Sequence, residues 1–290
     1  KIESDERTTL VELEINNGKA NRAKVNQNPV RSQKELLGLV KSVCFSPEDL
    51  DLVRGDPSER RSFLDQLLIQ QSPRLAGVIS DYERALKQRN SLLKSRAPES
   101  SLRSWSEHLA TFGGELIAGR IKLINQIEPL FQIAYKNLSA KKLAKLGYKS
   151  SIPAPSVEKE ENKESILKVI EEVKTQEIER GISLVGPHRD DLLLNLGDHP
   201  VKSYASHGES WSIALALRLA SYQLFINEGA KPILILDDVF SELDEGRREK
   251  LLEIADSAEQ TFITVAVEND LPKAIQGARF KVEMGKVVIL

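Results

Sequence analysis

The 290-residue chain is 40% hydrophobic and 29% charged, with a net charge of −2, a composition that is ordinary for a soluble protein. No apolar run approaches the roughly 18 residues that a membrane span needs, and the N-terminal residues lack the apolar core of a secretory signal, so we expect a cytoplasmic protein without a membrane contact. The single cysteine, Cys44, excludes an internal disulfide and a cysteine-based metal site.

The first 56 residues are predicted to be rich in β-structure. Residues 8–15 alternate between apolar and polar side chains, and Asn16-Asn17-Gly18 is a turn signal, so residues 19–25 are expected to return as the second arm of a hairpin. A short helix at residues 34–40 and a strand at residues 41–45 follow. Cys44 lies within this strand between Val43 and Phe45, and its apolar neighbours predict a core position rather than a nucleophile.

Two helix starts come next in the chain. Ser46-Pro47-Glu48-Asp49 offers an N-cap serine, a proline at the first helical position and an acid three residues on. Asp56-Pro57-Ser58-Glu59 repeats this pattern and opens a helix with Arg60 and Arg61 near its start. Both segments therefore predict the start of a helix.

Residues 57–149 are predicted to be mostly helical, because two apolar stripes at helical spacing follow each other with a break at residues 97–100. Long antiparallel helices of this kind describe an arm better than a compact lobe. A proline-containing connector at residues 150–156 follows, and residues 157–176 are expected to form a helix that re-enters the main lobe.

The charge of the chain is unevenly distributed along it. Residues 51–150 contain 17 basic and 10 acidic side chains, whereas residues 181–290 contain 11 basic and 17 acidic side chains. A basic surface confined to one region is typical of polyanion binding. A solvated helical face would show the same excess, so charge alone leaves both interpretations open.

Residues 182–185 and 192–196 are predicted to be strands on either side of Gly186-Pro187-His188-Arg189-Asp190-Asp191. One interpretation of this turn is a hairpin with a local ion pair. The other places His188 and Arg189 near a bound nucleotide or a DNA phosphate, with Arg60 and Arg61 as further candidates for such contacts.

Ser206-His207-Gly208-Glu209-Ser210 precedes a strong helix pattern at residues 211–225. A serine and a glycine before a long helix form a cradle of backbone N–H groups, which the helix dipole reinforces and which accepts phosphate. Serine is also a common N-cap, so this segment alone does not distinguish a phosphate site from an ordinary helix start.

Residues 233–236 form a continuous apolar run, which suits a strand buried on both faces of a sheet, and the run ends in Asp237 and Asp238. Open α/β sheets bind ligands outside the carboxyl ends of their strands. Paired acids at this edge are how phosphate-handling proteins hold Mg²⁺, and the second acid is placed to orient or deprotonate a water. The alternative is a strand end with two solvated aspartates.

Ser241-Glu242-Leu243-Asp244 is then expected to cap a helix through residues 248–255, before another apolar strand at residues 261–267. Together these parts resemble the ABC-type ATPases of the SMC-like branch. Within that branch, four stretches are similar to the bacterial RecF family of recombination mediators. These are FSPEDLDLVRGDPSERRSFLD (45–65), YKSSI (148–152), RGISLVGPHRDDL (180–192) and LILDDVFSELD (234–244).

The four stretches follow the order of the family and span nearly the whole chain. The resemblance implies an α/β ABC-type ATPase lobe, incomplete at its N-terminus, with an inserted, mainly helical arm. Residues 1–56 and 157–290 would form the two parts of the lobe, and residues 57–156 would form the arm.

The resemblance also assigns roles to individual residues. Asp237 would bind the Mg²⁺ that accompanies ATP, and Asp238 would be the catalytic base or water-orienting group. Ser206, Gly208 and Glu209 match the signature that contacts the γ-phosphate of a nucleotide held by the opposite subunit.

Two loops complete this assignment. Ser241 and Asp244 match the loop that crosses the dimer interface, and residues 46–49 are placed like the segment that couples nucleotide to the arm. Relatives in the wider class often carry a switch histidine where this chain has Glu268-Asn269-Asp270. Sensing of the γ-phosphate by that route is therefore in doubt.

The activity that the resemblance implies is that of an ATP-dependent homodimeric clamp on DNA. Its partners would be double-stranded DNA, junctions between single- and double-stranded DNA, and the protein RecR. Its work would be the loading of recombinase at single-strand gaps in DNA repair and replication, as part of the response to DNA damage, including the SOS response. Contacts with DNA should be made mainly to phosphates and should be sensitive to salt.

ATPases of this type hold the triphosphate on a G-x-x-x-x-G-K-[ST] loop, and the 290 residues contain no such segment. Residues 114–120 mimic the glycine spacing, but they end in Arg120 before Ile121 and lie within a helical stripe. Because the family begins with this loop, we infer that roughly the first quarter of the protein is absent from the chain. We expect the chain neither to bind ATP tightly nor to hydrolyse it.

Two other classes of function remain open at this point. The chain can be a nucleotide-independent scaffold for DNA or a partner protein, with vestigial ATPase motifs. It can also be the ATPase subunit of a transporter, although the basic arm and the absence of a membrane-coupling partner in the chain disfavour this class. Nucleotide-dependent dimerisation would exclude the scaffold, and retention on DNA would exclude the transporter subunit.

Overall fold

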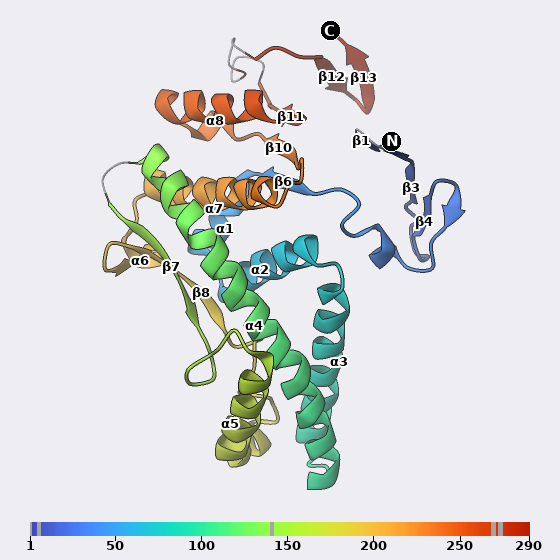
Figure 1. Ribbon diagram of the computed structural model, residues 1–290, viewed down its shortest axis with the longest axis vertical. Helices are drawn as coiled ribbons and strands as arrows, with labels where there is room; N and C mark the ends of the chain where they lie inside the picture. Colours follow the sequence, from blue (N-terminus) through green and yellow to red (C-terminus); the bar gives the residue numbers. More distant parts are fainter. Residues whose placement is uncertain (1, 5–6, 140–141, 268–270, 272–274) are drawn as a thin grey trace.

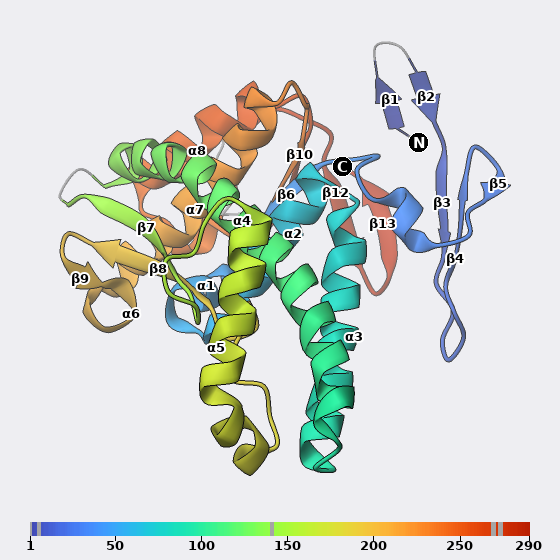
Figure 2. The ribbon, with the colours of Figure 1, turned by 60° about the horizontal axis from the view of Figure 1, so that its bottom comes forward.

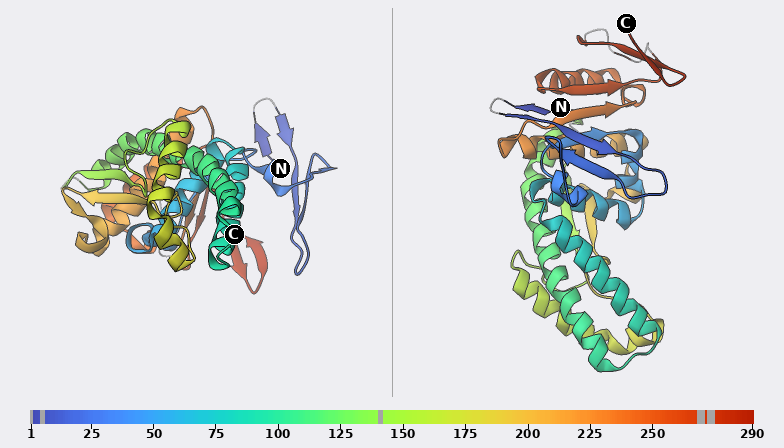
Figure 3. Two further views of the ribbon diagram at one scale, coloured as in Figure 1. Left: turned by 90° about the horizontal axis from the view of Figure 1, so that it is seen from below. Right: turned by 90° about the vertical axis from the view of Figure 1, so that its right-hand side faces the viewer.

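The computed structural model describes residues 2–4, 7–139, 142–267, 271 and 275–290. A mixed α/β lobe carries the terminal hairpins at one end, and long helices extend from its other end as an arm (Figures 1 and 3). Among the described helices, none is both long and apolar enough to cross a membrane.

Three parallel strands form the centre of the lobe. The strand β10 (Ile233–Asp237) lies between β6 (Ser42–Phe45) and β11 (Thr261–Thr264). In β10, Leu234 and Leu236 are buried, whereas Ile233 and Ile235 are only half-buried. The strand expected at residues 233–236 is thus confirmed, but its burial on both faces is only partial.

Cys44 is exposed, which corrects its predicted core position. Successive side chains of a strand point to opposite faces of the sheet. In β6, Val43 and Phe45 are buried, and Phe45 packs edge-on against Trp211 of α7 (His207–Asn227) with 5.8 Å between ring centroids. Cys44 therefore faces the opposite side, which α7 does not cover.

The helix α7 joins the sheet to the arm. It packs against β6 and against α4 (Glu99–Leu138), and most of its side chains between Ser210 and Phe225 are buried. Such an all-round apolar helix is typical of the centre of a protein. The helix predicted at residues 211–225 is confirmed.

Four helices build the arm and its base. At the base lies α2 (Pro57–Gln71), and α3 (Leu75–Lys94), α4 and α5 (Lys159–Arg180) follow. The helices α3 and α5 both pack against α4 and also contact each other, and α4 continues into the lobe (Figures 1 and 2). The expected break in the helical pattern is confirmed, because α3 ends at Lys94 and α4 begins at Glu99.

A second sheet is antiparallel and consists of β7 (Ala144–Lys149), β8 (Asp191–Leu196) and β9 (His199–Pro200). The strand β7 corrects the helix expected to reach residue 149. No strand forms at residues 182–185. Their backbone N–H groups bind side chains instead, since Ser183 N donates to Asn90 Oδ1 (2.7 Å) and Leu184 N donates to Glu177 Oε1 (2.7 Å).

Smaller elements complete the described chain. The expected hairpin near the N-terminus is confirmed as β3 paired with β4, and the short helix expected at residues 34–40 is a 3-10 turn. These elements are β1 (Ile2–Ser4), β2 (Arg7–Thr9), β3 (Val11–Glu14), β4 (Arg22–Val25), β5 (Asn28–Pro29), η1 (Gln33–Leu36), η2 (Pro47–Asp49), α1 (Leu50–Arg54), α6 (Val201–Tyr204), η3 (Phe240–Glu242), α8 (Glu245–Ser257), β12 (Phe280–Glu283) and β13 (Lys286–Ile289).

Two glycines of α4 provide a matched test of how closely α4 and α5 pack. A Cβ atom at Gly114 would lie 2.5 Å from Lys159 O, whereas a Cβ atom at Gly119 would lie 3.5 Å from the nearest atom of Leu68. We expect Gly114→Ala to lower the free energy of unfolding by about 2 kcal/mol through overpacking. Gly119→Ala should raise it by about 0.5–1 kcal/mol, because alanine favours a helix interior.

Urea-induced unfolding followed by circular dichroism measures both changes. Changes of equal sign and size for the two variants would contradict the close approach of the α4 and α5 backbones at Gly114.

Candidate functional site

The two acids at the end of β10 are held by one residue of the neighbouring strand. Thr264 lies opposite Asp237 in the parallel register of β10 and β11. Its hydroxyl donates a hydrogen bond to Asp237 Oδ1 and accepts one from the backbone N–H of Asp238 (3.2 Å). The same N–H donates to Thr264 O at 3.1 Å. Thr264 thus holds the carboxylate of Asp237 and the backbone of Asp238. Asp237 is exposed and Asp238 is half-buried.

Asp238 adopts a left-handed backbone conformation, with φ at +52°. For a residue with a Cβ this conformation costs roughly 1–2 kcal/mol, and aspartate and asparagine tolerate it best. Two contacts compensate: Ala266 N donates to Asp238 Oδ1 (3.3 Å), and Ser241 Oγ donates to Asp238 O (3.1 Å). Backbone strain of this type clusters at functional sites, which supports a role for the turn that contains Asp238.

The N-terminus of α7 is closed by a reciprocal cap. Ser206 Oγ accepts from Glu209 N (3.3 Å), and Glu209 Oε2 accepts from Ser206 N (2.9 Å). The bond from the Ser206 backbone, together with Lys142 Nζ at 3.0 Å, lowers the pKa of Glu209 to about 2. Within the described chain, no acceptor contacts the N–H groups of His207 and Gly208, so both N–H groups are available to an anion.

Residues 242–247 connect the acid-bearing turn to this helix start. Arg247 Nη1 forms an ion pair with Asp244 Oδ2 (3.0 Å), and a Cβ atom at Gly208 would lie 3.5 Å from the same nitrogen. His207 Nε2 accepts from the indole N–H of Trp211 (3.0 Å) and lies 3.9 Å from Glu242 Oε2. The structure therefore brings the two predicted loops, residues 206–209 and 241–244, together within one chain.

The acid pair and the helix start make no direct polar contact among the described residues. In the part of the chain that the structure describes, no hydrogen bond or ion pair joins Asp237 or Asp238 to Ser206 or Gly208. Two carboxylates at a strand end and two free N–H groups at a helix start are thus two separate half-sites. Oxygen ligands of this kind suit Mg²⁺, which takes one or two carboxylates together with phosphate oxygens.

The expectation that Arg60 contacts a phosphate is corrected by its burial. Its side chain is 6% exposed and binds Asp191 through two parallel hydrogen bonds of 2.7 and 3.0 Å. Arg61 donates to Asp190 O (2.9 Å). These partners lie far from the arginines in sequence, so the alternative of a local ion pair within a hairpin is also wrong.

His188 and Arg189 also make internal contacts. His188 Nδ1 lies 2.6 Å from the Tyr82 hydroxyl oxygen, and burial lowers the pKa of His188 to about 4, so the ring is neutral near pH 7. Arg189 is exposed at the surface, but its Nε and Nη2 both donate to Ser183 O (3.1 and 2.8 Å). The turn at residues 186–191 is thus a packing junction between the arm and the lobe.

The segment at residues 46–49 contacts α7 directly. Asp49 is 4% exposed and accepts hydrogen bonds from Nε and Nη2 of Arg218 at 3.0 and 2.5 Å. Arg54 Nε donates to Ser210 Oγ at 3.3 Å. These contacts connect the entry into the arm helices with the first turns of α7.

Three residues at the two half-sites were missed by sequence reasoning: Thr264, Arg247 and Lys142. Thr264 lies within the strand predicted at residues 261–267 and ends the observed β11, so parallel pairing of this strand with the acid strand was the signal for it. Arg247 and Lys142 reach α7 from distant segments and carry no motif. The expected replacement of the switch histidine, Glu268-Asn269-Asp270, lies outside the described residues.

No protein-family model matches the chain. Among curated proteins, it is 50% identical over 299 residues to "DNA replication and repair protein RecF" of Streptomyces avermitilis, covering 99% of the chain and 80% of that protein. The protein of the same name from Beutenbergia cavernae is 47% identical over 322 residues, covering 99% and 81% of the two chains.

Two solved structures resemble the chain. The recombination mediator protein RecF-ATPrS in the RecFOR pathway has a TM-score of 0.88 and 27% identity, covering 97% of this chain and 76% of that chain. RecF-ATP in the same pathway has a TM-score of 0.83 and 27% identity, covering 93% and 73%.

Substitutions at the two acids test the conformation of the Asp238 turn. We expect Asp238→Gly to unfold with a free energy about 1 kcal/mol higher than Asp238→Ala, since glycine adopts the left-handed region without strain. Both variants lack the carboxylate, so their difference isolates the backbone. At Asp237, which lies in β10, the order should reverse, because glycine weakens a strand by roughly 0.5–1 kcal/mol. Urea-induced unfolding gives all four values; the same order at both positions would contradict the strained turn.

Proposed function

The chain belongs to the RecF family of DNA replication and repair proteins, and from this membership we propose that it acts as an ATP-dependent homodimeric clamp on DNA. The family resemblance and the ABC-type α/β fold with a long helical segment, both predicted from sequence, are confirmed. The observation that carries the proposal is that, among the described residues, no hydrogen bond or ion pair joins the acid pair to the start of α7 within one chain.

Two copies related by a two-fold axis would complete both half-sites at once, since such an interface presents the same patch from each subunit. The acids of one subunit would then face the α7 start of the other across a nucleotide. Solved relatives are described with ATP and with ATPrS, which supports nucleotide binding by this chain.

Within this arrangement each residue has a separate task. Asp237 would hold Mg²⁺ through its carboxylate, and the metal supplies the positive charge that phosphoryl transfer needs. Asp238 would orient or deprotonate a water. Thr264 keeps the carboxylate of Asp237 in place, and Ala266 N donates to that of Asp238. From the partner subunit, the free N–H groups at the start of α7 would bind the γ-phosphate. Arg247 would add a positive charge beside them.

The biological role proposed for the chain is recombinase loading on gapped DNA, together with RecR. The curated relatives carry the name of a DNA replication and repair protein, and the solved relatives are described in the RecFOR pathway. The excess of basic residues between 51 and 150 supports contact with DNA phosphates.

One observation favours a nucleotide-independent scaffold instead. The 290 residues contain no G-x-x-x-x-G-K-[ST] loop, on which ATPases of this type hold most of the triphosphate. In that case the two half-sites would remain separate whether or not ATP is present.

Light scattering after size exclusion separates the two proposals when it is applied to the full-length protein with and without ATP and Mg²⁺. The clamp predicts a nucleotide-dependent shift from monomer to dimer mass. Ser206→Arg should abolish this shift, because a large side chain would block the α7 start. Ser100→Arg, at an exposed position of the arm, should leave it intact. If the wild type and both variants each have the same mass with and without nucleotide, the result would support the scaffold.

A further inference from the structure

Three exposed basic residues form one stripe along α3. Arg84, Lys87 and Lys94 are all exposed, and their spacing of three and seven residues places them on one face of the helix. We define these three residues as the α3 basic stripe. The exposed hydroxyls of Ser80 and Ser91 lie on the same face. The segment thus presents cationic and hydroxyl donors, with two exposed acids, Asp81 and Glu83, beside them.

The α3 basic stripe has no internal partner. Among the described residues, no hydrogen bond or ion pair involves Arg84, Lys87 or Lys94. By contrast, Arg89 on the buried face of the same helix is paired with Glu177 of α5 at 2.6 Å. Within the helix, Asp81 lies three residues before Arg84 and Glu83 lies four residues before Lys87, so these two acids offset part of the positive charge of the stripe and an external anion would offset the rest.

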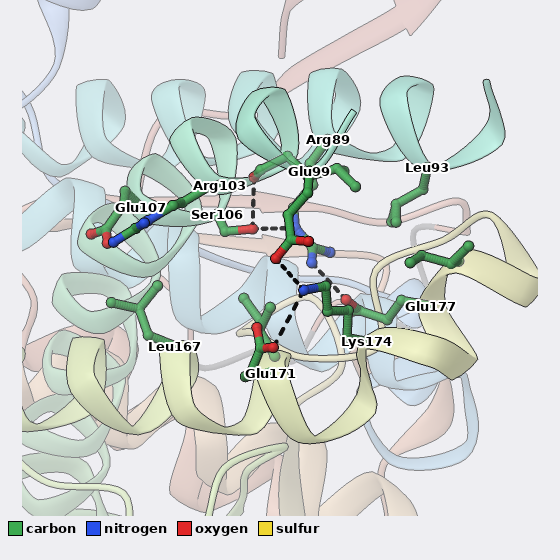
Figure 4. Close-up of a pocket in the computed structure, with 13 residues that line it drawn as sticks. Arg89, Leu93, Glu99, Arg103, Ser106, Glu107, Leu167, Glu171, Lys174 and Glu177 are labelled. Atoms are coloured by element: carbon green, nitrogen blue, oxygen red, sulfur yellow. Dashed lines mark hydrogen bonds and ion pairs between the residues drawn. The ribbon is translucent and has the colours of Figure 1, made fainter. Parts of the chain in front are cut away.

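The helix α5 is acidic overall. It carries seven acidic and five basic residues, of which Glu177 is buried in its pair with Arg89 of α3. Lys174 of α5 lies between Glu99 and Glu171 beside a cavity of about 310 Å³ that α3, α4 and α5 line together (Figure 4). The exposed charged side chains of α5 are therefore mostly acidic, whereas the α3 basic stripe is positive.

A groove of about 500 Å³ follows the basic side. Lys87, Ser91 and Lys94 line it together with Glu83, Leu86 and Asn90. Ammonium and hydroxyl donors suit phosphate oxygens, and a single acid, Glu83, opposes them. The stripe from Arg84 to Lys94 is about 15 Å long at 1.5 Å per residue, which is long enough to contact several phosphates of a duplex that carries one charge per roughly 1.7 Å of axis.

We propose that the α3 basic stripe binds the phosphates of duplex DNA and that the exposed side chains of α5 do not. The inference rests on the proposed function, because it assigns a surface to the DNA contact of the clamp. The α3 basic stripe takes the place of Arg60, Arg61 and His188 as the candidate for contact with DNA, because the side chains of those three residues make internal contacts.

The test compares two variants that remove the same charge. In the α3 variant, Arg84, Lys87 and Lys94 are all replaced by Gln. In the α5 variant, Lys159, Lys163 and Lys168 are replaced by Gln. Fluorescence anisotropy with a labelled duplex of about 30 base pairs measures affinity between about 50 and 200 mM salt, with and without ATP and Mg²⁺.

The α3 variant should bind the duplex at least about tenfold more weakly, and the slope of log affinity against log salt should fall by about 0.9 for each phosphate that the variant no longer binds. The α5 variant should stay close to the wild type. An α3 variant that binds like the wild type, or an α5 variant that is weakened as much, would overturn the assignment while the binding of DNA by the wild type still supports the clamp. A wild type that binds no DNA would overturn both.

Acetylation of lysines in the unmodified protein provides a second measurement. DNA should protect Lys87 and Lys94 from acetylation, as read by mass spectrometry, and should leave Lys168 reactive. Equal reactivity of Lys87 and Lys94 with and without bound DNA would contradict the inference, independently of any effect of the substitutions on folding.

Discussion

The parallel pairing of β10 with β11 is the constraint on which the candidate site depends. It sets Thr264 beside Asp237, so that one hydroxyl and one carbonyl fix the two acids. The position of β10 is itself set by the core, because Leu234 and Leu236 are buried beneath α7. Apolar packing of β10 therefore determines where the chain leaves the sheet at Asp238. The polar contacts of the turn then fix the backbone conformation of Asp238.

A second constraint joins the arm to this lobe. The helix α4 runs through both, and three buried arginines bridge segments that are distant in sequence. Arg60 binds Asp191, Arg89 binds Glu177, and Arg120 binds Asp65 at 2.9 and 2.8 Å. Loss of one partner from a buried pair leaves an unpaired charge and costs roughly 3–5 kcal/mol. The Arg60 pair thus joins the base of the arm to the second sheet, whereas the other two pairs hold the helices of the arm and its base together.

Local patterns account for the parts of the structure that the sequence predicted well. Three elements depend mainly on their own residues, and each is found as expected. They are the strand at the apolar run before Asp237, the hairpin at the turn signal of residues 16–18 and the capped start of α7 at its serine. The roles of Asp237, Asp238, Ser206 and Gly208 came from family resemblance, and the structure places these residues in two half-sites without testing the roles.

The wrong predictions concern residues whose surroundings come from elsewhere in the chain. Cys44 is exposed because α7 covers only the other face of β6. The apolar neighbours of Cys44 in the sequence do not show which face is covered. Residues 182–185 are apolar enough for a strand, but Asn90 and Glu177 bind their backbone. Arg60 has the pattern of a surface cation, yet its partner is Asp191, 131 residues away. Long-range pairing of this kind leaves no signal in a single sequence.

The central claim is that acids and helix start from different subunits form one site, and mixed dimers test it most directly. Full-length Asp238→Ala and Ser206→Arg proteins, each inactive alone, are combined in equal amounts, and ATP hydrolysis is measured. A shared site predicts that hydrolysis recovers in the mixture, because each mixed dimer has one intact site of two whereas neither variant alone can form any. A mixture that stays as inactive as its two components would show that each subunit forms its site alone.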